Sequence, residues 1–79
     1  MARATEREIA AGITIDPEVC FGKPVVKGTR VPIAVVLEQL ALGATVNEVA
    51  EEYGIQPDDV LAVLRYAHEL VAGEDVRAI

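Results

Sequence analysis

Three basic side chains without a neighbouring acid are the clearest chemical signal in this sequence. Lys23, Lys27 and Arg30 are three of the seven basic residues, and the nearest acids on either side are Glu18 and Glu38. Lysine and arginine pair with carboxylates and neutralise phosphates, so such a cluster is typical of a surface that binds an anion. These three residues are therefore the first candidates for contacts with DNA.

The net charge of −6 is unevenly distributed along the chain. Residues 1–45 contain five basic and five acidic residues, whereas residues 46–79 contain two basic and eight acidic residues. The whole surplus of negative charge therefore lies in the second half. Because a polyanion is repelled by acidic surface, we expect it to bind the first half of the chain.

No set of residues typical of an enzyme is present. His68 is the only histidine and Cys20 the only cysteine, and the sequence contains no serine and no glycine-rich phosphate loop. The adjacent acids Asp58 and Asp59 would project to different sides of a helix instead of converging on a metal. We predict a protein that is not an enzyme and needs no cofactor, with Cys20 as a small buried hydrophobe.

The segment around the basic residues predicts a small β element. Ile13–Ile15 alternates apolar and polar residues before Asp16-Pro17 ends it, and the β-branched pair Val25-Val26 lies between two turn signals. Two strands this short cannot form a stable sheet alone. They must pack on helices or pair with a second chain.

The N-terminal segment and the domain boundary follow from length and composition. Thr5 and Glu8 have the spacing of a capping box, which indicates a short, marginal helix before Gly12. We interpret residues 1–12 as an arm and residues 13–79 as a single domain. No apolar run approaches the roughly 20 residues that span a bilayer, and no signal peptide is recognisable, so a cytoplasmic protein is expected.

Three helices are expected in the rest of the chain. The first runs from about Pro32 to Leu42 and has one apolar face. The second begins after Thr45, with Glu48 at the capping-box position, and ends at Gly54. The third begins at Pro57, a residue favoured in the first helical turn, and ends near Ala72.

The second and third of these helices have the pattern of a DNA-binding helix-turn-helix. Ala50 is small where two helices must approach closely, and Gly54 lies in the tight turn. Ile55, Val60 and either Val63 or Leu64 would then face the preceding helix. A plain helical hairpin has the same packing requirements, and it remains the alternative.

The chemistry of this motif is less favourable to DNA than its spacing. Gln56 could read adenine and Arg65 could contact a phosphate or guanine. Asp58 and Asp59 would bring carboxylates towards the phosphates unless they cap the helix. Both readings therefore stay open: a helix-turn-helix that binds DNA, or a protein-interaction module that keeps the same packing without touching DNA.

The third helix is apolar over more of its circumference than a single stripe. Apolar residues occupy seven of its positions: Val60, Leu61, Val63, Leu64, Ala67, Leu70 and Val71. A 79-residue chain has little material to cover both sides of such a helix. We therefore expect a homodimer, a bound protein partner, or both, with Leu64 and Val71 as candidate contacts.

Several ordered motifs together resemble a known family. These are I-T-I-D-P from Ile13, C-F-G-K-P-V-V-K-G-T-R-V-P-I from Cys20, A-L-G-A-T-V-N-E-V-A-E-E-Y-G-I from Ala41 and D-V-L-A-V-L-R-Y-A from Asp59. In this order they resemble domain-of-unknown-function family 433, over roughly residues 13–68. The resemblance implies a small helix-turn-helix antitoxin, VapB-like, that is commonly paired with a PIN-like ribonuclease toxin.

The resemblance gives Arg30 a possible partner. A PIN-like ribonuclease has a cluster of carboxylates that holds a divalent metal, and a fixed guanidinium could neutralise it. Arg30 could equally bridge to Asp16 or Glu18 within its own fold. The expected architecture is thus mostly α, with a short N-terminal β element and a three-helix, homeodomain-like or winged-helix-like domain.

Overall fold

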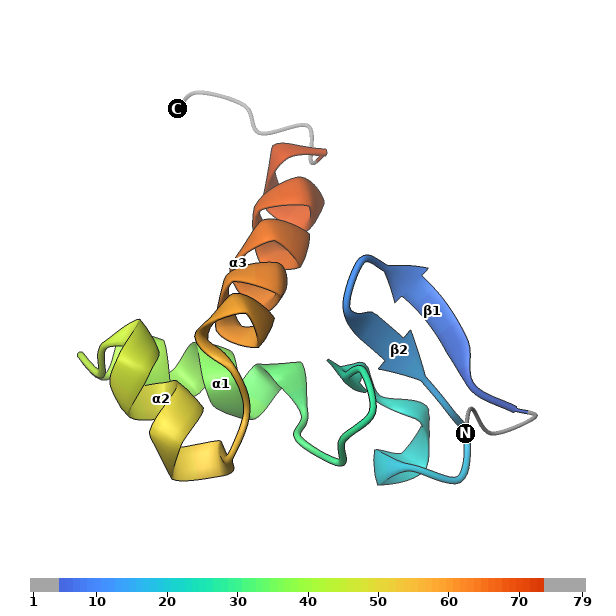
Figure 1. Ribbon diagram of the computed structural model, residues 1–79. Coiled ribbons are helices and arrows are strands. Elements are labelled where there is room, and N and C mark those ends of the chain that lie inside the picture. The colour runs from blue at the N-terminus through green and yellow to red at the C-terminus, as the bar shows by residue number, and fades with distance from the viewer. Residues whose placement is uncertain (1–4, 74–79) are drawn as a thin grey trace.

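The computed structural model describes residues 5–73 as a small antiparallel sheet followed by three helices (Figure 1). Strands β1 (Arg7–Ala10), β2 (Ile13–Ile15) and β3 (Val25–Val26) are neighbours in that order. The mostly helical fold with an N-terminal β element is confirmed. The first four residues of the proposed arm and the last six of the proposed domain lie outside the described part of the chain.

The expectation of a short helix around Thr5 and Glu8 is wrong. Arg7–Ala10 is instead an edge strand whose partner is β2, with Arg7 opposite Ile15 and Glu8 opposite Thr14. The spacing of a capping box indicates a helix only where the residues that follow can form one. Here the following turn at Gly12, with φ of 81°, directs the chain back as a hairpin.

The helices begin and end close to where their capping residues predict. Helix α1 is Ile33–Ala41, α2 is Val46–Tyr53 and α3 is Pro57–Ala72. Pro32 is the N-cap of α1, one residue before the helix and not its first residue. A short 3-10 segment, η1 (Cys20–Gly22), lies between β2 and β3.

Local hydrogen bonds explain the boundaries of α2 and α3. The Glu48 backbone N–H donates to Thr45 Oγ1 at 3.1 Å, and the Thr45 N–H donates to Glu48 Oε1 at 2.8 Å, which confirms the capping box. This bond from the Thr45 N–H lowers the pKa of the Glu48 carboxyl. Gly54 ends α2 in the left-handed conformation, as its position indicates.

One core joins the sheet to the helices. Six side chains are completely or almost completely buried in it: Ile13, Val26, Val36, Val49, Val60 and Val63. Ala50 and Ile55 are also buried, so the predicted close approach of α2 and α3 is present. Val63 and not Leu64 is the buried member of the predicted pair. No helix among residues 5–73 has the length and apolar character needed to cross a bilayer.

Candidate functional site

A rigid loop between β3 and α1 positions Arg30. The Thr29 Oγ1 atom accepts a hydrogen bond from the Val31 N–H at 3.0 Å and donates one to the Val26 carbonyl at 2.8 Å. The Val26 N–H donates to the Val31 carbonyl at 2.9 Å, and the Thr29 N–H returns to the Val26 carbonyl at 3.0 Å. Hydrogen bonds thus join both ends of the loop that carries Arg30.

The Arg30 side chain is exposed and available. Its guanidinium makes no hydrogen bond or ion pair with any residue among 5–73, so no bridge to Asp16 or Glu18 is formed. Lys23 is also exposed and has no acidic partner within the same residues. Both side chains are therefore exposed cations that are open to a negatively charged group.

Lys27 differs from the other two cations because it already has a carboxylate partner. Its Nζ atom lies 2.9 Å from Glu8 Oε1, and Glu8 Oε2 accepts the Gly12 N–H at 2.9 Å. The Gly12 N–H and then Lys27 lower the pKa of the Glu8 carboxyl, and the same pair raises the pKa of Lys27. This exposed pair joins the loop to the β1–β2 turn and partly neutralises the charge of Lys27.

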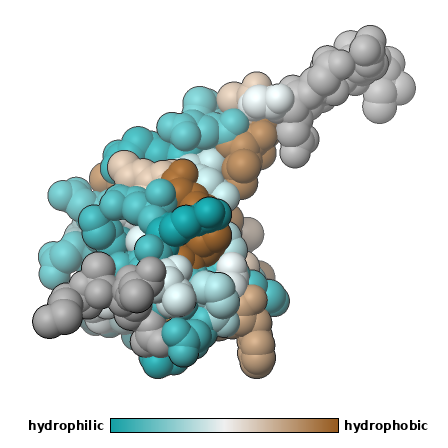
Figure 2. Space-filling model, turned by 90° about the vertical axis from the view of Figure 1, so that its right-hand side faces the viewer, coloured by the Kyte–Doolittle hydropathy of each residue, from teal (hydrophilic) through white to brown (hydrophobic). Residues whose placement is uncertain are grey.

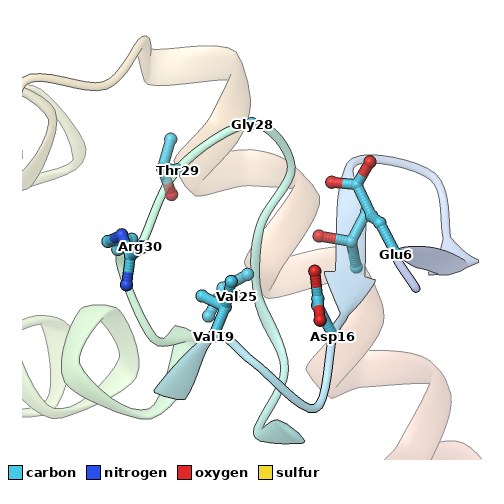
Figure 3. Close-up of a pocket in the computed structure, with 8 residues that line it drawn as sticks. Glu6, Asp16, Val19, Val25, Gly28, Thr29 and Arg30 are labelled. Carbon is cyan, nitrogen blue, oxygen red and sulfur yellow. The ribbon is translucent and has the colours of Figure 1, made fainter. Parts of the chain in front are cut away.

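A cavity of about 420 Å³ lies beside the Arg30 loop. Its lining consists of Glu6, Thr14, Asp16, Val19, Val25, Gly28, Thr29 and Arg30. Arg30 lies on one side, Glu6 and Asp16 lie on the other, and the two valines lie between them (Figure 3). Asp16 is buried and its Oδ1 accepts hydrogen bonds from Thr5 Oγ1 at 2.7 Å and from the Glu18 N–H at 2.9 Å.

The cavity is lined by charged side chains of both signs and by apolar residues. Within the described residues no three acidic, histidine or cysteine side chains are grouped so that they could hold a metal ion. One wall carries carboxylates, the opposite rim carries a guanidinium, and the valines between them are apolar. The cavity thus combines both signs of charge with an apolar floor, as ligand pockets commonly do.

The two DNA candidates on α3 are separated from each other. Gln56 is the exposed N-cap of α3, and Arg65 lies nine residues further along. Nine residues correspond to about two and a half helical turns, which place the two side chains on opposite sides of the helix axis. Arg65 instead borders a smaller cavity of about 140 Å³ next to Ile9 and Ala10.

The two aspartates at the start of α3 have different surroundings. The Asp59 carboxylate accepts the Gln56 N–H at 2.9 Å and thereby caps the helix. Asp58 is exposed at the same end. One of the two carboxylates is thus directed back to the backbone, as a helix cap requires, and the other faces solvent.

Leu64 and Val71 lie on one stripe of α3. Seven residues separate them, about two turns, and both are exposed, at 37% and 62%. Leu61, at 41% exposure, lies one turn before Leu64 on the same side, and Figure 2 shows apolar surface near the C-terminal end of α3. Leu61, Leu64, His68 and Val71 have the three-four-three spacing of a coiled-coil seam, which we call the α3 stripe.

The Arg30 loop and the C-terminal end of α3 lie at opposite ends of the domain (Figure 1). The residues predicted to bind a toxin therefore do not form one patch. Arg30 belongs to the cavity side, whereas Leu64 and Val71 belong to the α3 stripe. The candidate residues therefore lie on two separate surfaces.

The sequence patterns did not indicate several features of the site. The partner of Lys27 lies 19 residues earlier on a strand that was expected to be helical. Cys20, predicted to be buried, is only half-buried, and its Sγ atom donates to the Arg30 carbonyl at 3.4 Å. The sequence patterns assign no role to Phe21, whose side chain is 97% exposed. The one available signal was an aromatic residue directly before the Gly22-Lys23-Pro24 turn.

Comparison with known proteins agrees with this fold. Residues 13–67 match the family described as "Protein of unknown function (DUF433)". A protein named "Putative antitoxin VapB45" from Mycobacterium tuberculosis (strain ATCC 25618 / H37Rv) is 42% identical over 50 residues. That match covers 63% of this chain but 21% of the relative, so the chain corresponds to about a fifth of that protein.

Two crystal structures resemble the fold. Rv2018 from Mycobacterium tuberculosis is 41% identical with a TM-score of 0.63, over 68% of this chain and 25% of that one. A DUF433 member from Anabaena variabilis ATCC 29413 is 29% identical with a TM-score of 0.67, over 73% of this chain and 58% of that one. The family match spans more than half of the sequence and the same core elements, and the chain therefore belongs to the DUF433 family.

Proposed function

We propose that the protein is an antitoxin that binds and neutralises a PIN-like ribonuclease toxin, and that it represses its own operator through a helix-turn-helix formed by α2 and α3. The name of the 42% identical relative supports the antitoxin role. The observation that carries the proposal is Arg30, an exposed cation without an internal partner among residues 5–73, on a hydrogen-bonded loop. A guanidinium held in this way can pair with the metal-binding carboxylates of such a ribonuclease.

In this proposal the α3 stripe has a separate role. It forms a homodimer in which the stripes of two copies cover each other, while the Arg30 loop of each copy remains open to a toxin. The exposure of Leu61, Leu64 and Val71 and their coiled-coil spacing support this arrangement. The antitoxin is expected to act in the cytoplasm.

Replacing Arg30 by lysine tests toxin binding. Arg30→Lys keeps the positive charge but removes the planar pair of donors, so inhibition of the ribonuclease should weaken by about tenfold or more. The melting temperature should not change, because the guanidinium has no partner among the described residues. Inhibition is measured by titrating the antitoxin into an RNA-cleavage assay.

The matched control is Arg65→Lys, the same substitution at an exposed arginine on α3. It should leave inhibition unchanged. If Arg30→Lys inhibits as well as the unmodified protein, Arg30 does not contact the catalytic carboxylates, and the α3 stripe becomes the better candidate for toxin binding.

DNA binding is tested by a gel-shift titration with the DNA upstream of the gene at two salt concentrations. If Lys23, Lys27 and Arg30 contact phosphates, replacing all three by alanine should lower the salt-dependence slope by about three. Asp58→Ala should leave binding unchanged or tighten it, because it removes a negative charge. An unchanged slope in the triple variant would remove these residues from the DNA interface.

A second candidate function is a dimeric protein-interaction module that does not bind DNA. Two observations favour it: Glu8 already pairs with Lys27, and the exposed start of α3 carries Asp58. In that case the gel shift shows no specific complex at either salt concentration, while toxin binding persists.

A further inference from the structure

Phe21 is the most exposed large apolar side chain among the described residues. Its relative exposure is 97%, compared with 75% for Leu42 and 62% for Val71. Burying an aromatic ring is strongly favourable, because the ring has a large apolar area to remove from water. A ring that stays exposed in the isolated chain forgoes this stabilisation. Such a ring on a protein surface marks a place where a partner is expected.

The backbone that presents Phe21 is unusual. Cys20, Phe21 and Gly22 are three consecutive residues in the left-handed region, with φ of 51°, 57° and 81°. Only glycine adopts this conformation without a penalty from its side chain. Phenylalanine thus occupies a position that disfavours it, and in the isolated chain its ring gains no burial in return.

Hydrogen bonds hold this turn firmly in place. The Gly22 N–H donates to the Val19 carbonyl at 3.0 Å, and the Lys23 N–H donates to the Cys20 carbonyl at 3.1 Å. The Cys20 Sγ atom donates to the Arg30 carbonyl at 3.4 Å and thereby joins the turn to the Arg30 loop. A strained conformation that is secured from several sides is typical of a functional site.

Two exposed cations, Lys23 and Arg30, lie on this turn's C-terminal side and on the loop that the turn contacts. Lys23 follows Phe21 by two residues, and the Arg30 loop is the one that the Cys20 thiol contacts. Neither cation has an acidic partner among residues 5–73. An exposed apolar ring on a turn that is followed by Lys23 and joined to the Arg30 loop fits a partner that has an apolar socket bordered by carboxylates.

We propose that Phe21 is the apolar anchor of the toxin interface: its ring inserts into a socket on the ribonuclease while Arg30 pairs with carboxylates at the edge of that socket. This inference rests on the proposed antitoxin function and extends it to a second residue. A single-stranded nucleic acid would also offer surfaces for stacking, but it normally binds several aromatic rings in succession. The other aromatic residues here, Tyr53 and Tyr66, are partly buried against the core, so a protein partner is favoured.

The variant Phe21→Asn separates binding from folding. Asparagine accepts the left-handed conformation more readily than phenylalanine, and the lost ring has no core contacts to forfeit. The melting temperature should therefore stay the same or rise, whereas affinity for the ribonuclease should fall by about tenfold or more. Affinity is measured by calorimetry with a purified PIN-like ribonuclease from the same organism, inactivated by replacing one metal-binding carboxylate.

Leu42→Asn is the matched control, because Leu42 is 75% exposed at the end of α1 and lies outside this turn. It should bind as tightly as the unmodified protein. A 20-residue oligothymidine is titrated in parallel as the nucleic-acid probe.

The outcomes distinguish failure of the proposed Phe21 anchor from failure of the proposed antitoxin function. If the unmodified protein binds the ribonuclease and Phe21→Asn binds it equally well, the anchor is refuted while the antitoxin function stands. If the unmodified protein does not bind the ribonuclease, the antitoxin function and the anchor are both refuted. If Phe21→Asn loses only oligothymidine binding, the ring serves nucleic acid, and the protein interface is refuted.

Discussion

Replacing Ile13 by alanine is expected to lower the free energy of unfolding by about 2–5 kcal/mol. Ile13 is completely buried in β2, where it lies opposite Ala10 of β1 and Val26 of β3, and it belongs to the same core cluster as residues of all three helices. Truncation removes apolar contacts and leaves a cavity that this small core cannot easily close. In a domain of this size each kcal/mol corresponds to about 4–8 °C in melting temperature.

The matched control for this prediction is Ile9→Ala on the neighbouring strand. Ile9 is 38% exposed, so the same truncation should cost much less than at Ile13. Chemical denaturation monitored by circular dichroism measures both variants. If Ile13→Ala destabilises the protein as little as Ile9→Ala, then the sheet is not part of the main core, and the helices are stable without it.

Leu64→Asp is expected to dissociate the proposed homodimer. Leu64 is the middle apolar residue of the α3 stripe, and a carboxylate there would be removed from water without a partner when two stripes meet. The dissociation constant should rise at least about tenfold, which is about 1.4 kcal/mol. The fold of each subunit should persist, because Leu64 is 37% exposed within the chain.

Leu42→Asp provides the comparison, since it places the same charge at an exposed leucine outside the stripe. Sedimentation velocity at micromolar concentration should show a dimer for the unmodified protein and for Leu42→Asp, and a monomer for Leu64→Asp. A monomer in all three cases would mean that the α3 stripe is covered by another protein or remains in water.

The helices were predictable because their ends are determined by adjacent residues. Thr45 with Glu48, Gly54 and Pro57 act within a few positions of the helix boundary, so the sequence alone contains the necessary information. Strand β1 was not predictable in the same way. A strand is stabilised by its partner, and Glu8 has the same spacing from Thr5 whether or not a helix forms.

The candidate site was predictable in its charges but not in its contacts. Lys23, Lys27 and Arg30 are exposed, as their residue types indicate. Of these three, only Lys27 has an ion-pair partner among the described residues, because strand β1 lies next to the loop and places Glu8 beside Lys27. The sequence does not reveal this proximity. The exposure of Phe21 depends on positive φ angles at three successive residues, Cys20 to Gly22. Patterns of apolar and polar residues do not predict such angles.

The order of the strands and helices has a consequence for how quickly the chain folds. Each strand pairs with its neighbour in the sequence, in the order β1-β2-β3, and α2 packs on α3 across one short turn at Gly54. Only short loops must close before these contacts form, although β2 must also meet α3, and mixed α/β domains of this kind fold more slowly than helical bundles but faster than all-β domains. A newly synthesised molecule would therefore reach its binding-competent shape far sooner than the ribosome could complete another copy. If the proposed function is correct, the concentration of active antitoxin follows its rate of synthesis without a delay from folding.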